Sequence, residues 1–487
     1  MSSTDRSGAG IEREADVAPH VVIVGAGFAG VACAKELGHQ GIAVTLIDKN
    51  TYHQFQPLLY QVATAQLSGG DIMRPIRGLF RKLPTVAVKE AEVTSIDPAT
   101  RTVTTSTGLT FTGTHLVIAM GARPNFFGVE GAAEHSLPLY SATDAVKLRN
   151  RILQLFEDAD LDATRIDKGA LNFVIVGAGA TGVETAGSLA DMINDVMPQR
   201  YHDLAVARSR VYLVDHGNVV LAPFSDKAHE YAAKALTKKH VQLMLGRSVV
   251  EVADDRVVFG DGTEIATRCV VWAGGLQAVR VDTTEPMSTV RGGRIEAGQD
   301  LGVDGFPGVY AVGDIAAVSG PDGSPYPQLG AVAMQAGTAA ANSILAEVAG
   351  KRTPSFDYHD KGIMAMIGRR AAVAEVGAHR HELHGPIAFG AWLGVHAWLL
   401  STTRARIDAF MNWAWDSFSK SRSPAIIDDP DAPRIDWGDE DDDHDDHDDH
   451  DDHDQAVQHD DEHEAEYDDE HEEDSPERSS HDQKETT

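Results

Sequence analysis

The hydrophobic pattern is clearest at residues 21–24, where an unbroken apolar run leads directly into a glycine-rich turn. A helical pattern follows the turn, and a second apolar run then ends at Asp48. This order of strand, glycine turn, helix, strand and acid predicts a dinucleotide-binding unit. Gly25 permits the tight turn, Gly27 lets the backbone approach a pyrophosphate, and Gly30 lets the helix pack against the strand. The pyrophosphate would lie at the helix N-terminus, whose unpaired amides and dipole favour anions.

The same pattern returns 152 residues later, counted from Gly25 to Gly177. Gly179 and Gly182 complete the second fingerprint, and its second apolar strand ends at Asp215. The intervening helix is longer, so Asp215 lies farther from the glycines than the usual spacing of about 20 residues. Two such units indicate either two dinucleotide sites or an internal duplication with one inactive copy. Because the second copy keeps its three glycines and its acid, the pattern favours two sites.

Other stretches extend this α/β pattern. An apolar strand at 308–312 is followed by Gly313 and Asp314, so Asp314 stands at a strand's carboxyl end, where ligands bind in open α/β sheets. The small residues of 330–345 predict a helix that can pack closely on a cofactor. The remaining predicted elements are hairpins at 87–106 and 252–265, a buried strand at 114–124, and a helix within 138–160 capped by Ser141 or Thr143.

The region 351–427 differs because it combines mixed strands with a stretch rich in aromatic and basic residues. Its apolar run 386–400 has 15 residues, fewer than the roughly 18–20 needed to span a bilayer. Aromatic and basic residues beside an apolar face are typical of a membrane interface. We therefore expect membrane-surface binding through Trp392–Lys420, with a protein–protein or dimer surface as the alternative. The residues concerned are Trp392, Trp398, Arg404, Arg406, Trp413, Trp415, Lys420 and Arg422.

The net charge of the chain says less about its partners than its size suggests. Residues 436–487 carry 27 acids and two bases, a charge of −25, which leaves about −7 of the total of −32 for the rest. This acidic, histidine-rich tail cannot form a core, and we expect a solvated segment rather than a specific metal site. The N-terminal arm has no apolar run and does not resemble a signal peptide. Nothing in the charge pattern indicates a nucleic-acid partner.

Four sequence motifs carry a resemblance to a known family. They are YHQFQPLLYQVAT at 52–64, GAGATGVETAG at 177–187, VVWAGG at 270–275 and AVAMQAG at 331–337. Together with the two glycine fingerprints, they resemble type II NADH dehydrogenase, the non-proton-pumping NADH:quinone oxidoreductase of the two-dinucleotide flavoprotein superfamily. The resemblance covers residues 20–422. It implies an α/β fold with two Rossmann-type domains, one for FAD and one for NADH, and a C-terminal helical membrane-anchoring region.

The resemblance also implies roles for individual residues. Asp314 would hold the FAD ribityl chain, Glu184 would lie near the flavin–nicotinamide contact and handle a proton, and Met334 and Gln335 would lie beside the isoalloxazine on the quinone side. FAD would further involve Gly25, Gly27, Gly30, Asp48 and Gly121, and NADH would involve Gly177, Gly179, Gly182 and Asp215. Additional cofactor contacts are expected at Ala26, Phe28, Ala29, Lys49, Val93, Thr181 and Gly274. The chain departs from the family at Asp215, where Glu is frequent, and at Ser188, which stands in place of a Glu.

The predicted domain boundaries follow from these motifs. They are a disordered arm at 1–18, the FAD-binding domain at 19–145 and 286–350, the NADH-binding domain at 146–285, the membrane-associating region at 351–427 and the acidic tail at 428–487. NADH would pass a hydride to the flavin, which would then give two electrons to a lipid-soluble quinone. With a cytoplasmic reductant and no export signal, we expect a peripheral protein on the cytoplasmic face of the cell membrane. The sequence leaves a homodimer open.

Two other functions are compatible with the fold. Sulfide:quinone oxidoreductases need active-site cysteines, whereas Cys33 lies in the first Rossmann helix and Cys269 in a predicted strand, which indicates packing roles and a reducing compartment. That reading is therefore disfavoured. A flavoprotein that senses redox state by binding NADH remains the second alternative, and the acidic tail could serve it.

Overall fold

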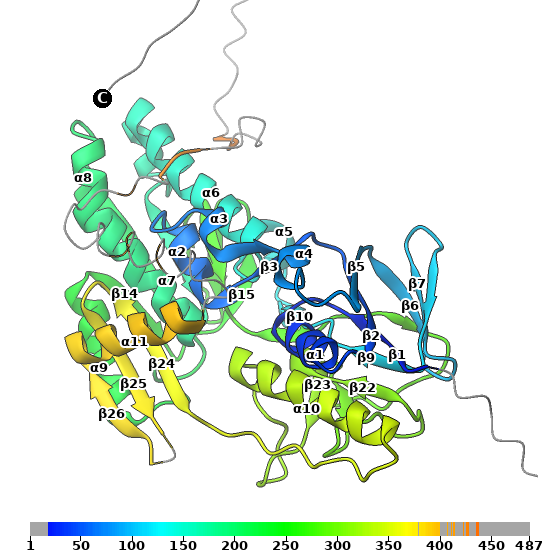
Figure 1. The fold of residues 1–487 in the computed structure, drawn as a ribbon. Coiled ribbons are helices and arrows are strands. Elements are labelled where there is room, and N and C mark those ends of the chain that lie inside the picture. The colour runs from blue at the N-terminus through cyan, green and yellow to red at the C-terminus, as the bar shows by residue number, and fades with distance from the viewer. Residues whose placement is uncertain are drawn as a thin grey trace, which may run out of the picture. The chain divides into compact units, whose positions relative to one another are not determined.

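The computed structural model describes residues 18–377 and 379–399, together with positions 407, 411, 413, 422, 425–427 and 435–437. Two five-stranded parallel sheets form its framework (Figure 1). The first has the spatial order β22 (Val309–Ala311), β9 (His115–Ile118), β1 (His20–Val24), β2 (Ala43–Asp48) and β5 (Val86–Glu90). The second has the order β11 (Leu137–Pro138), β18 (Cys269–Trp272), β12 (Asn172–Val176), β13 (Arg210–Asp215) and β14 (Val241–Leu245).

Both sheets grow in the same way from a buried central strand. β1 pairs in parallel with β2, with His20 opposite Ala43, and β12 pairs in parallel with β13, with Asn172 opposite Arg210. Strands covered on both faces need nearly continuous apolar residues, which both central strands have. α1 (Phe28–His39) and α7 (Ala180–Asp191) form the crossover helices. The predicted α/β fold with parallel sheets is therefore confirmed.

Two long helices complete the packing of these sheets. α6 (Ala142–Leu161) begins at Ser141, whose hydroxyl accepts the Asp144 N–H at 3.1 Å while Asp144 accepts the Ser141 N–H at 2.8 Å. Of the two predicted caps, Ser141 is the one used. α10 (Gly330–Val348) lies against α1 (Figure 1), and a Cβ added to Gly337 would come 2.1 Å from the Ala29 carbonyl oxygen.

The other helices are short. They are α2 (Leu59–Ala63), α3 (Gly69–Ile72), α4 (Ile76–Leu79), α5 (Ala132–His135), α8 (Met197–Arg200) and α9 (Asp226–Lys238), with 3-10 turns at Gln56–Leu58, Ala163–Ile166, Val206–Arg208 and Gly313–Ile315 and a π-turn at Met192–Val196. α2 packs on α6 and α7, so the apolar segment around it belongs to the core of the second unit.

Small additional sheets accompany both units. The predicted hairpins are found as β6 (Val93–Asp97) with β7 (Thr102–Thr105), and as β16 (Arg256–Phe259) with β17 (Glu264–Ala266). The remaining short strands are β3 (Tyr52–Gln54), β4 (Met73–Pro75), β8 (Thr110–Thr112), β15 (Val249–Val252), β20 (Asp282–Thr283), β21 (Ile295–Ala297) and β23 (Ala316–Val318).

A pair of antiparallel strands carries the chain from the first unit to the second and back. β10 (Ala122–Pro124) leaves the first sheet and β19 (Leu276–Ala278) returns to it, with Arg123 opposite Gln277. The second unit is therefore inserted into the first at one place. This explains why the first sheet takes β22 from late in the chain while β11, early in the insertion, occupies the matching position of the second sheet.

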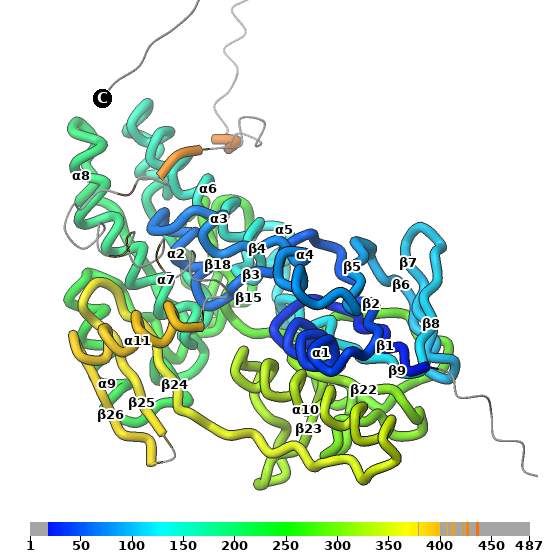
Figure 2. Tube along the Cα trace, in the orientation of Figure 1, coloured from blue at the N-terminus to red at the C-terminus, as the bar shows by residue number. Residues whose placement is uncertain are grey.

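The C-terminal region forms a third sheet rather than an extension of the other two. β24 (Gly362–Gly368), β25 (Ala371–Val376) and β26 (His381–His384) are antiparallel, and α11 (Gly385–Leu399) packs on them. Figure 2 shows the long segment that links α10 to β24. β24 lies on α7, where a Cβ on Gly187 would come 2.2 Å from the Ile367 carbonyl oxygen. Among the described helices, none has the length and apolar character needed to cross a bilayer.

The expected aromatic surface across Trp392–Lys420 is wrong for two of its tryptophans. Trp392 is fully buried and Trp413 nearly so, both within the core of the second unit, whereas Trp398 is 66% exposed. The reason is the α11 stripe of Gly385, Ala388, Trp392 and His396, which faces inward at helical spacing. Arg422 is also buried and donates to the carbonyl oxygens of Thr64 and Ser188. The other expected members, Arg404, Arg406, Trp415 and Lys420, lie outside the described residues.

The chain packs once more at Trp437, within the segment predicted to be a solvated tail. The indole N–H donates to Asp158 Oδ2 at 3.0 Å. The guanidinium groups of Arg165 and Arg268 lie 5.4 and 5.2 Å from the ring centroid, and Lys168 donates to the Trp437 carbonyl oxygen at 3.0 Å. The packed part of the chain therefore includes Trp437, and the histidine-rich residues beyond it lie outside the described residues.

Candidate functional site

The first glycine turn joins β1 to α1 at the carboxyl edge of the first sheet. Gly25 has a φ of 100°, and a Cβ there would lie 2.4 Å from the Ala119 carbonyl oxygen. A Cβ on Gly30 would lie 1.8 Å from the Gly25 carbonyl oxygen. At Gly27, by contrast, an added Cβ would meet no atom within 4 Å. Two of the glycines therefore serve the fold, and the third faces open space beside the helix N-terminus.

Asp48 holds this turn from the end of β2. Its Oδ2 accepts the Ala26 N–H at 2.6 Å, and its Oδ1 accepts the Asn50 N–H at 2.8 Å. The Ala26 carbonyl oxygen is bonded to His53 Nδ1 at 2.8 Å, and burial lowers the pKa of His53, which favours the neutral ring. A carboxylate oxygen has a second lone pair, so Asp48 can still accept a ribose hydroxyl.

The second glycine turn repeats this geometry between β12 and α7. Gly177 has a φ of 107°, and a Cβ on Gly182 would lie 1.8 Å from the Gly177 carbonyl oxygen. Asp215 Oδ2 accepts the Ala178 N–H at 2.6 Å. An added Cβ on Gly179 would meet no atom within 4 Å. Both turns therefore offer unfilled space and unpaired helix amides to an anionic group.

Asp314 stands where the sequence places it, directly after β22 and beside the first glycine turn. Gly313 has a φ of 75°, and a Cβ there would lie 3.1 Å from the Ala29 Cβ. Burial raises the pKa of Asp314, while Arg294 and the Tyr140 hydroxyl lower it. A buried carboxyl near these two donors can accept hydroxyl groups of a polyol chain. Burial also raises the pKa of Tyr140 to about 12, so it remains a neutral donor.

The other predicted cofactor residues lie around the two turns. Gly121 follows β9 with a φ of 73°, and a Cβ there would lie 3.3 Å from the Tyr140 hydroxyl. Gly274 follows β18 and approaches the Trp272 ring. Phe28, Ala29 and Thr181 belong to the first turns of α1 and α7, Lys49 is exposed after Asp48, Met334 is half-buried on α10, and Val93 is buried in the core of the first unit.

Gln335 has a clear structural partner. Its amide donates to the His359 carbonyl oxygen at 3.1 Å and accepts the His359 N–H at 3.0 Å. This bidentate contact ties α10 to the segment that leads into the third sheet. The side chain is half-buried. Its expected role toward a quinone therefore stays a prediction, alongside this positioning of the linker.

Glu184 is buried on α7, with 9% of its surface exposed. Its Oε1 accepts the Met366 N–H at 3.1 Å, which joins α7 to β24. Burial raises the pKa of Glu184 to about 8, against smaller lowering effects of the Met366 amide and the Trp392 indole. A carboxyl group with this pKa is protonated at neutral pH and can donate a proton.

A series of aromatic contacts that the sequence pattern did not predict leads from the first glycine turn to Trp392, beside Glu184. The rings of Phe28 and Phe55 meet edge to face with centroids 5.7 Å apart, Phe55 meets His396 at 6.3 Å, and His396 stacks on Trp392 at 3.9 Å. Tyr60 lies against Trp392 at 6.3 Å. This buried aromatic cluster, Phe28, Phe55, Tyr60, Trp392 and His396, connects the first glycine turn with α11. The inward stripe of α11, spaced by three and four residues, was the available signal for it.

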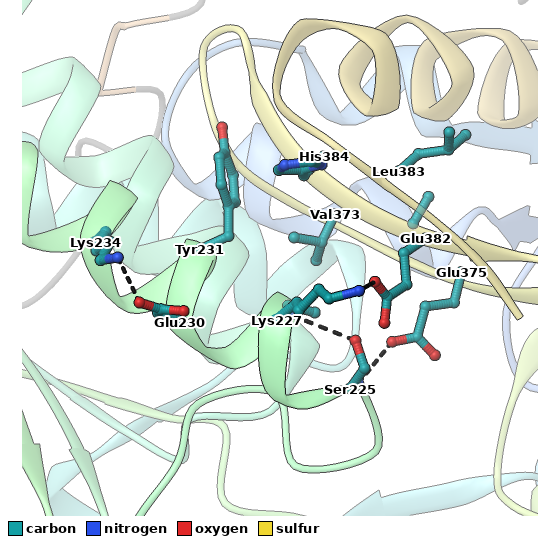
Figure 3. Close-up of a pocket in the computed structure, with 12 residues that line it drawn as sticks. Ser225, Lys227, Glu230, Tyr231, Lys234, Val373, Glu375, Glu382, Leu383 and His384 are labelled. Carbon is teal, nitrogen blue, oxygen red and sulfur yellow. Dashed lines mark hydrogen bonds and ion pairs between the residues drawn. The ribbon is translucent and has the colours of Figure 1, made fainter.

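A groove of about 270 Å³ lies elsewhere, between α9 and the strands β25 and β26 (Figure 3). Its charged side chains are already paired, Lys227 with Glu382 at 3.0 Å and Lys234 with Glu230 at 2.5 Å. No residue of either glycine turn lines it. The groove therefore belongs to the packing of the third sheet on the second unit and is not lined by the residues predicted to bind a cofactor.

Both cysteines are buried, and burial raises the pKa of each thiol to about 12. A thiol of this kind is protonated and unreactive at neutral pH. Cys33 lies in α1 and Cys269 in β18, as predicted. Neither can hold sulfur in the way that a sulfide:quinone oxidoreductase requires.

Comparison with known proteins agrees with this geometry. Residues 19–337 match the family model of the pyridine nucleotide-disulphide oxidoreductases. The chain is 37% identical to the type II NADH:quinone oxidoreductase Ndh of Mycobacterium tuberculosis over 85% of this chain and 91% of that protein. It is 29% identical to the type II NADH:quinone oxidoreductase of Staphylococcus saprophyticus over 73% of this chain and 89% of that protein.

Solved structures share the fold at lower identity. NDH2 from Plasmodium falciparum, solved in complex with NADH, has a TM-score of 0.78 at 19% identity, over 84% of this chain and 100% of that one. The sulfide:quinone oxidoreductase of Aquifex aeolicus has a TM-score of 0.65 at 17% identity, over 83% of this chain and 96% of that one. The sequence relatives and the family model together establish that the chain belongs to the type II NADH:quinone oxidoreductases, within the pyridine nucleotide-disulphide oxidoreductase family.

Proposed function

We propose that the first glycine turn holds FAD, that the second receives NADH, and that electrons leave the flavin for a lipid-soluble quinone. As a member of its family, the chain is an NADH:quinone oxidoreductase. The observation that carries the assignment of the two sites is the pair of matching glycine turns, each with open space at its middle glycine, Gly27 or Gly179. The family model and the Plasmodium relative solved with NADH support this pairing.

The residues present fit FAD at the first turn. Gly27 leaves a cradle that a Cβ would fill, the first amides of α1 can bind a pyrophosphate, and Asp48 can accept ribose hydroxyls. Asp314 and Gly121 would border the ribityl chain and the ring system. When bound, FAD supplies the group that accepts a hydride from NADH and releases two electrons. The protein's part is to bind, to orient and to exclude water.

Glu184 is our candidate for the proton donor to the quinone. Its carboxyl is neutral below a pH of about 8 because burial raises its pKa, so it can give a proton to a quinone oxygen at neutral pH. The aromatic cluster joins Phe28, in the first glycine turn, to Trp392 beside Glu184. We expect the rate of quinone reduction to fall as the pH rises through about 8, since the carboxylate has no proton to give.

The same raised pKa has a consequence for stability. Glu184 is buried as the neutral acid, so the stability that it contributes is fully present below its unfolded pKa of about 4.5 and is lost as the pH rises through about 8. Glu184→Gln should remove this dependence. Thermal unfolding of the two proteins at several pH values between about 4.5 and 8 measures it, and an unchanged pH dependence in the variant would show that other groups are responsible.

α11 supplies a surface for the membrane. Its outward side carries Ile387, Val395 and Trp398, which are 73%, 40% and 66% exposed. Such an apolar helix face can rest in the headgroup boundary without crossing the bilayer. We propose peripheral binding to the cytoplasmic face of the cell membrane through this face, which places the enzyme where both NADH and a lipid-soluble quinone are available.

Liposome co-sedimentation tests the membrane surface. Replacing Ile387 and Trp398 with Glu should release the protein from liposomes while its bound flavin stays in place. Leu161→Glu is the matched control, because Leu161 is 82% exposed but lies at the end of α6. If the α11 variant still binds liposomes as the native protein does, the proposed surface is wrong.

NADH oxidation with and without a soluble quinone analogue tests the function as a whole. We expect rapid turnover with the analogue and slow turnover without it. A redox-sensing flavoprotein, the second candidate, would turn over slowly in both cases. The flavin content of the purified protein, measured by absorbance, shows in the same experiment whether FAD is resident.

A further inference from the structure

The indole N–H of Trp392 has no obvious function in the fold. The side chain is fully buried, and Nε1 has no hydrogen-bond partner among the described residues. A buried donor without an acceptor costs free energy, and such groups are rare in folded proteins. Ring contacts hold the indole in place, since it stacks on His396 with 3.9 Å between centroids and meets the edges of Tyr60 and Trp413.

The Glu184 carboxyl is the acceptor that best suits this N–H. Its Oε1 takes the Met366 N–H at 3.1 Å, which leaves acceptor capacity on the group. Trp392 is close enough to lower the pKa of Glu184, although burial dominates and raises it. The two side chains come from α11 and α7, so their approach depends on the packing of the third sheet on the second unit.

We propose that Trp392 is a positioning residue whose indole N–H binds the ionised Glu184 carboxylate during quinone reduction. The inference rests on the proposed role of Glu184. In the overall reaction NADH supplies two electrons and one proton as a hydride, and the quinone needs a second proton to become a quinol. For that second proton the Glu184 O–H bond breaks, and the proton moves to a quinone oxygen. The carboxylate that remains later regains a proton from water. The indole N–H then stabilises the carboxylate for as long as it exists.

Two further ionisable side chains in the aromatic cluster do not change charge around pH 8. From α2, burial raises the pKa of Tyr60 well above its usual value, and from α11, burial lowers the pKa of His396 to about 4, so both are neutral there. Several charged groups on α7 and around it are held in ion pairs or hydrogen bonds. They include Asp191, Asp195, Asp215, Lys239, Arg369 and Arg422.

Stopped-flow measurement of the quinone half-reaction tests the proposal. Flavin-loaded protein is first reduced with NADH and then mixed with a soluble quinone analogue on both sides of pH 8. Trp392→Phe keeps an aromatic ring but removes the N–H donor. We expect re-oxidation to slow severalfold at low pH and the pH midpoint to rise by about 1 pH unit, because the charged form of Glu184 loses a hydrogen bond. Flavin reduction by NADH should stay unchanged.

Trp413→Phe is the matched control, because Trp413 lies in contact with Trp392 but donates its N–H to Gln61 at 2.8 Å. It should leave the midpoint in place. A Trp392→Phe midpoint equal to that of the native protein, or a shift also seen in Trp413→Phe, would overturn the proposal. Glu184→Gln distinguishes a failure of the role proposed for Glu184 from a failure of the role proposed for Trp392. If the rate of re-oxidation still falls with rising pH in Glu184→Gln, the proposed role of Glu184 fails. If that fall is lost in Glu184→Gln but the midpoint of Trp392→Phe does not move, only the role of Trp392 is rejected.

Discussion

The two glycine turns have matching backbone geometry and hydrogen bonds, but different elements pack against them. Gly25 and Gly177 have φ values of 100° and 107°, and in each turn the strand-end acid accepts the next amide at 2.6 Å. The first turn is covered by α10, where Gly337 approaches the Ala29 carbonyl oxygen. The first turn of α7 is instead exposed at 179–181.

This difference distinguishes the ability to bind a dinucleotide from the time for which it stays bound. A fingerprint that is repeated bond for bond gives both turns the means to hold a pyrophosphate. The cover decides how readily the bound molecule leaves, because a covered site must lose packing before its ligand can dissociate. The comparison therefore supports the proposed assignment of a resident cofactor to the first glycine turn and of an exchanging substrate to the second.

The largest expected effect comes from the helix glycines. Gly30→Ala and Gly182→Ala each place a Cβ 1.8 Å from a carbonyl oxygen, which forces the backbone to move at a cost of about 1–3 kcal/mol. We expect Gly30→Ala to lose its bound flavin and all activity. Gly182→Ala should keep its flavin while kcat/KM for NADH falls about tenfold or more. Flavin absorbance and steady-state kinetics measure the two outcomes.

The middle glycine offers a control for this pair. Gly179→Ala meets no protein atom within 4 Å, so it should leave thermal stability without nucleotide unchanged and still raise KM for NADH. Loss of flavin from the second-turn variants, or an unchanged KM in Gly179→Ala, would contradict the assignment of the two turns.

The strand-end acids should differ in nucleotide choice. Under the proposed assignment, Asp215 would carry a charge where NADPH brings its extra phosphate, and like charges there would cost about 1 kcal/mol or more. We expect a strong preference for NADH, which Asp215→Asn narrows about tenfold. Asn keeps one oxygen that can accept the Ala178 N–H.

Asp48→Asn is the counterpart in the first turn and should leave the nucleotide preference unchanged. Catalytic efficiencies with NADH and NADPH for the native protein and both variants provide the measurement. Equal efficiencies in the native protein would remove the basis for this difference between the turns.

α10, which packs against the first glycine turn, should also matter for the re-oxidation of the flavin by quinone. Gln335→Ala removes the two hydrogen bonds that tie α10 to His359, so we expect flavin re-oxidation to slow about tenfold while flavin reduction by NADH is unchanged. Gln299→Ala is the control, because Gln299 donates to the Ser319 carbonyl oxygen on the surface of the same unit. If only the reductive step slows in Gln335→Ala, the faces of the flavin are assigned the wrong way round.

The smallest effect is expected from the acidic tail. A chain that ends after Trp437 should keep its flavin and its activity with NADH and quinone, because both turns are complete without the tail. A chain that ends at 427 also loses the Trp437 contacts with Asp158, Arg165 and Arg268, and we expect its second unit to unfold at a lower temperature. Equal melting temperatures for the two chains would show that these contacts are weak.

The turns could be predicted from the sequence because their signals are local. The Gly30 spacing follows from one steric requirement, the close approach to the Gly25 carbonyl oxygen. Ser141 is likewise defined by Asp144, three positions later. In each case a few neighbouring residues contain both partners of the interaction, so the pattern is legible without knowledge of the rest of the fold.

The burial of Trp392 and Trp437 could not be predicted in the same way. α11 is apolar on all sides, so its periodicity does not say which face turns inward, and the partners that decide this include the strands β24, β25 and β26. Trp437 stands in a stretch whose composition predicts disorder, and composition averages over a single aromatic residue. Its acceptor, Asp158, is 279 positions away in the chain.

The single passage between the two units has a mechanical consequence. β10 and β19 lie side by side, so the two chain crossings between the first and second units are adjacent. With these crossings alone, the second unit could rotate about them as about a single hinge. The third sheet restrains this rotation. β24 packs against α7 at Gly187, and Asp191 pairs with Lys239 and accepts the Arg369 N–H. Rotation of the second unit would break these contacts. Under the proposed function, each exchange of NADH for NAD would then take place on a rigid frame, at the exposed first turn of α7.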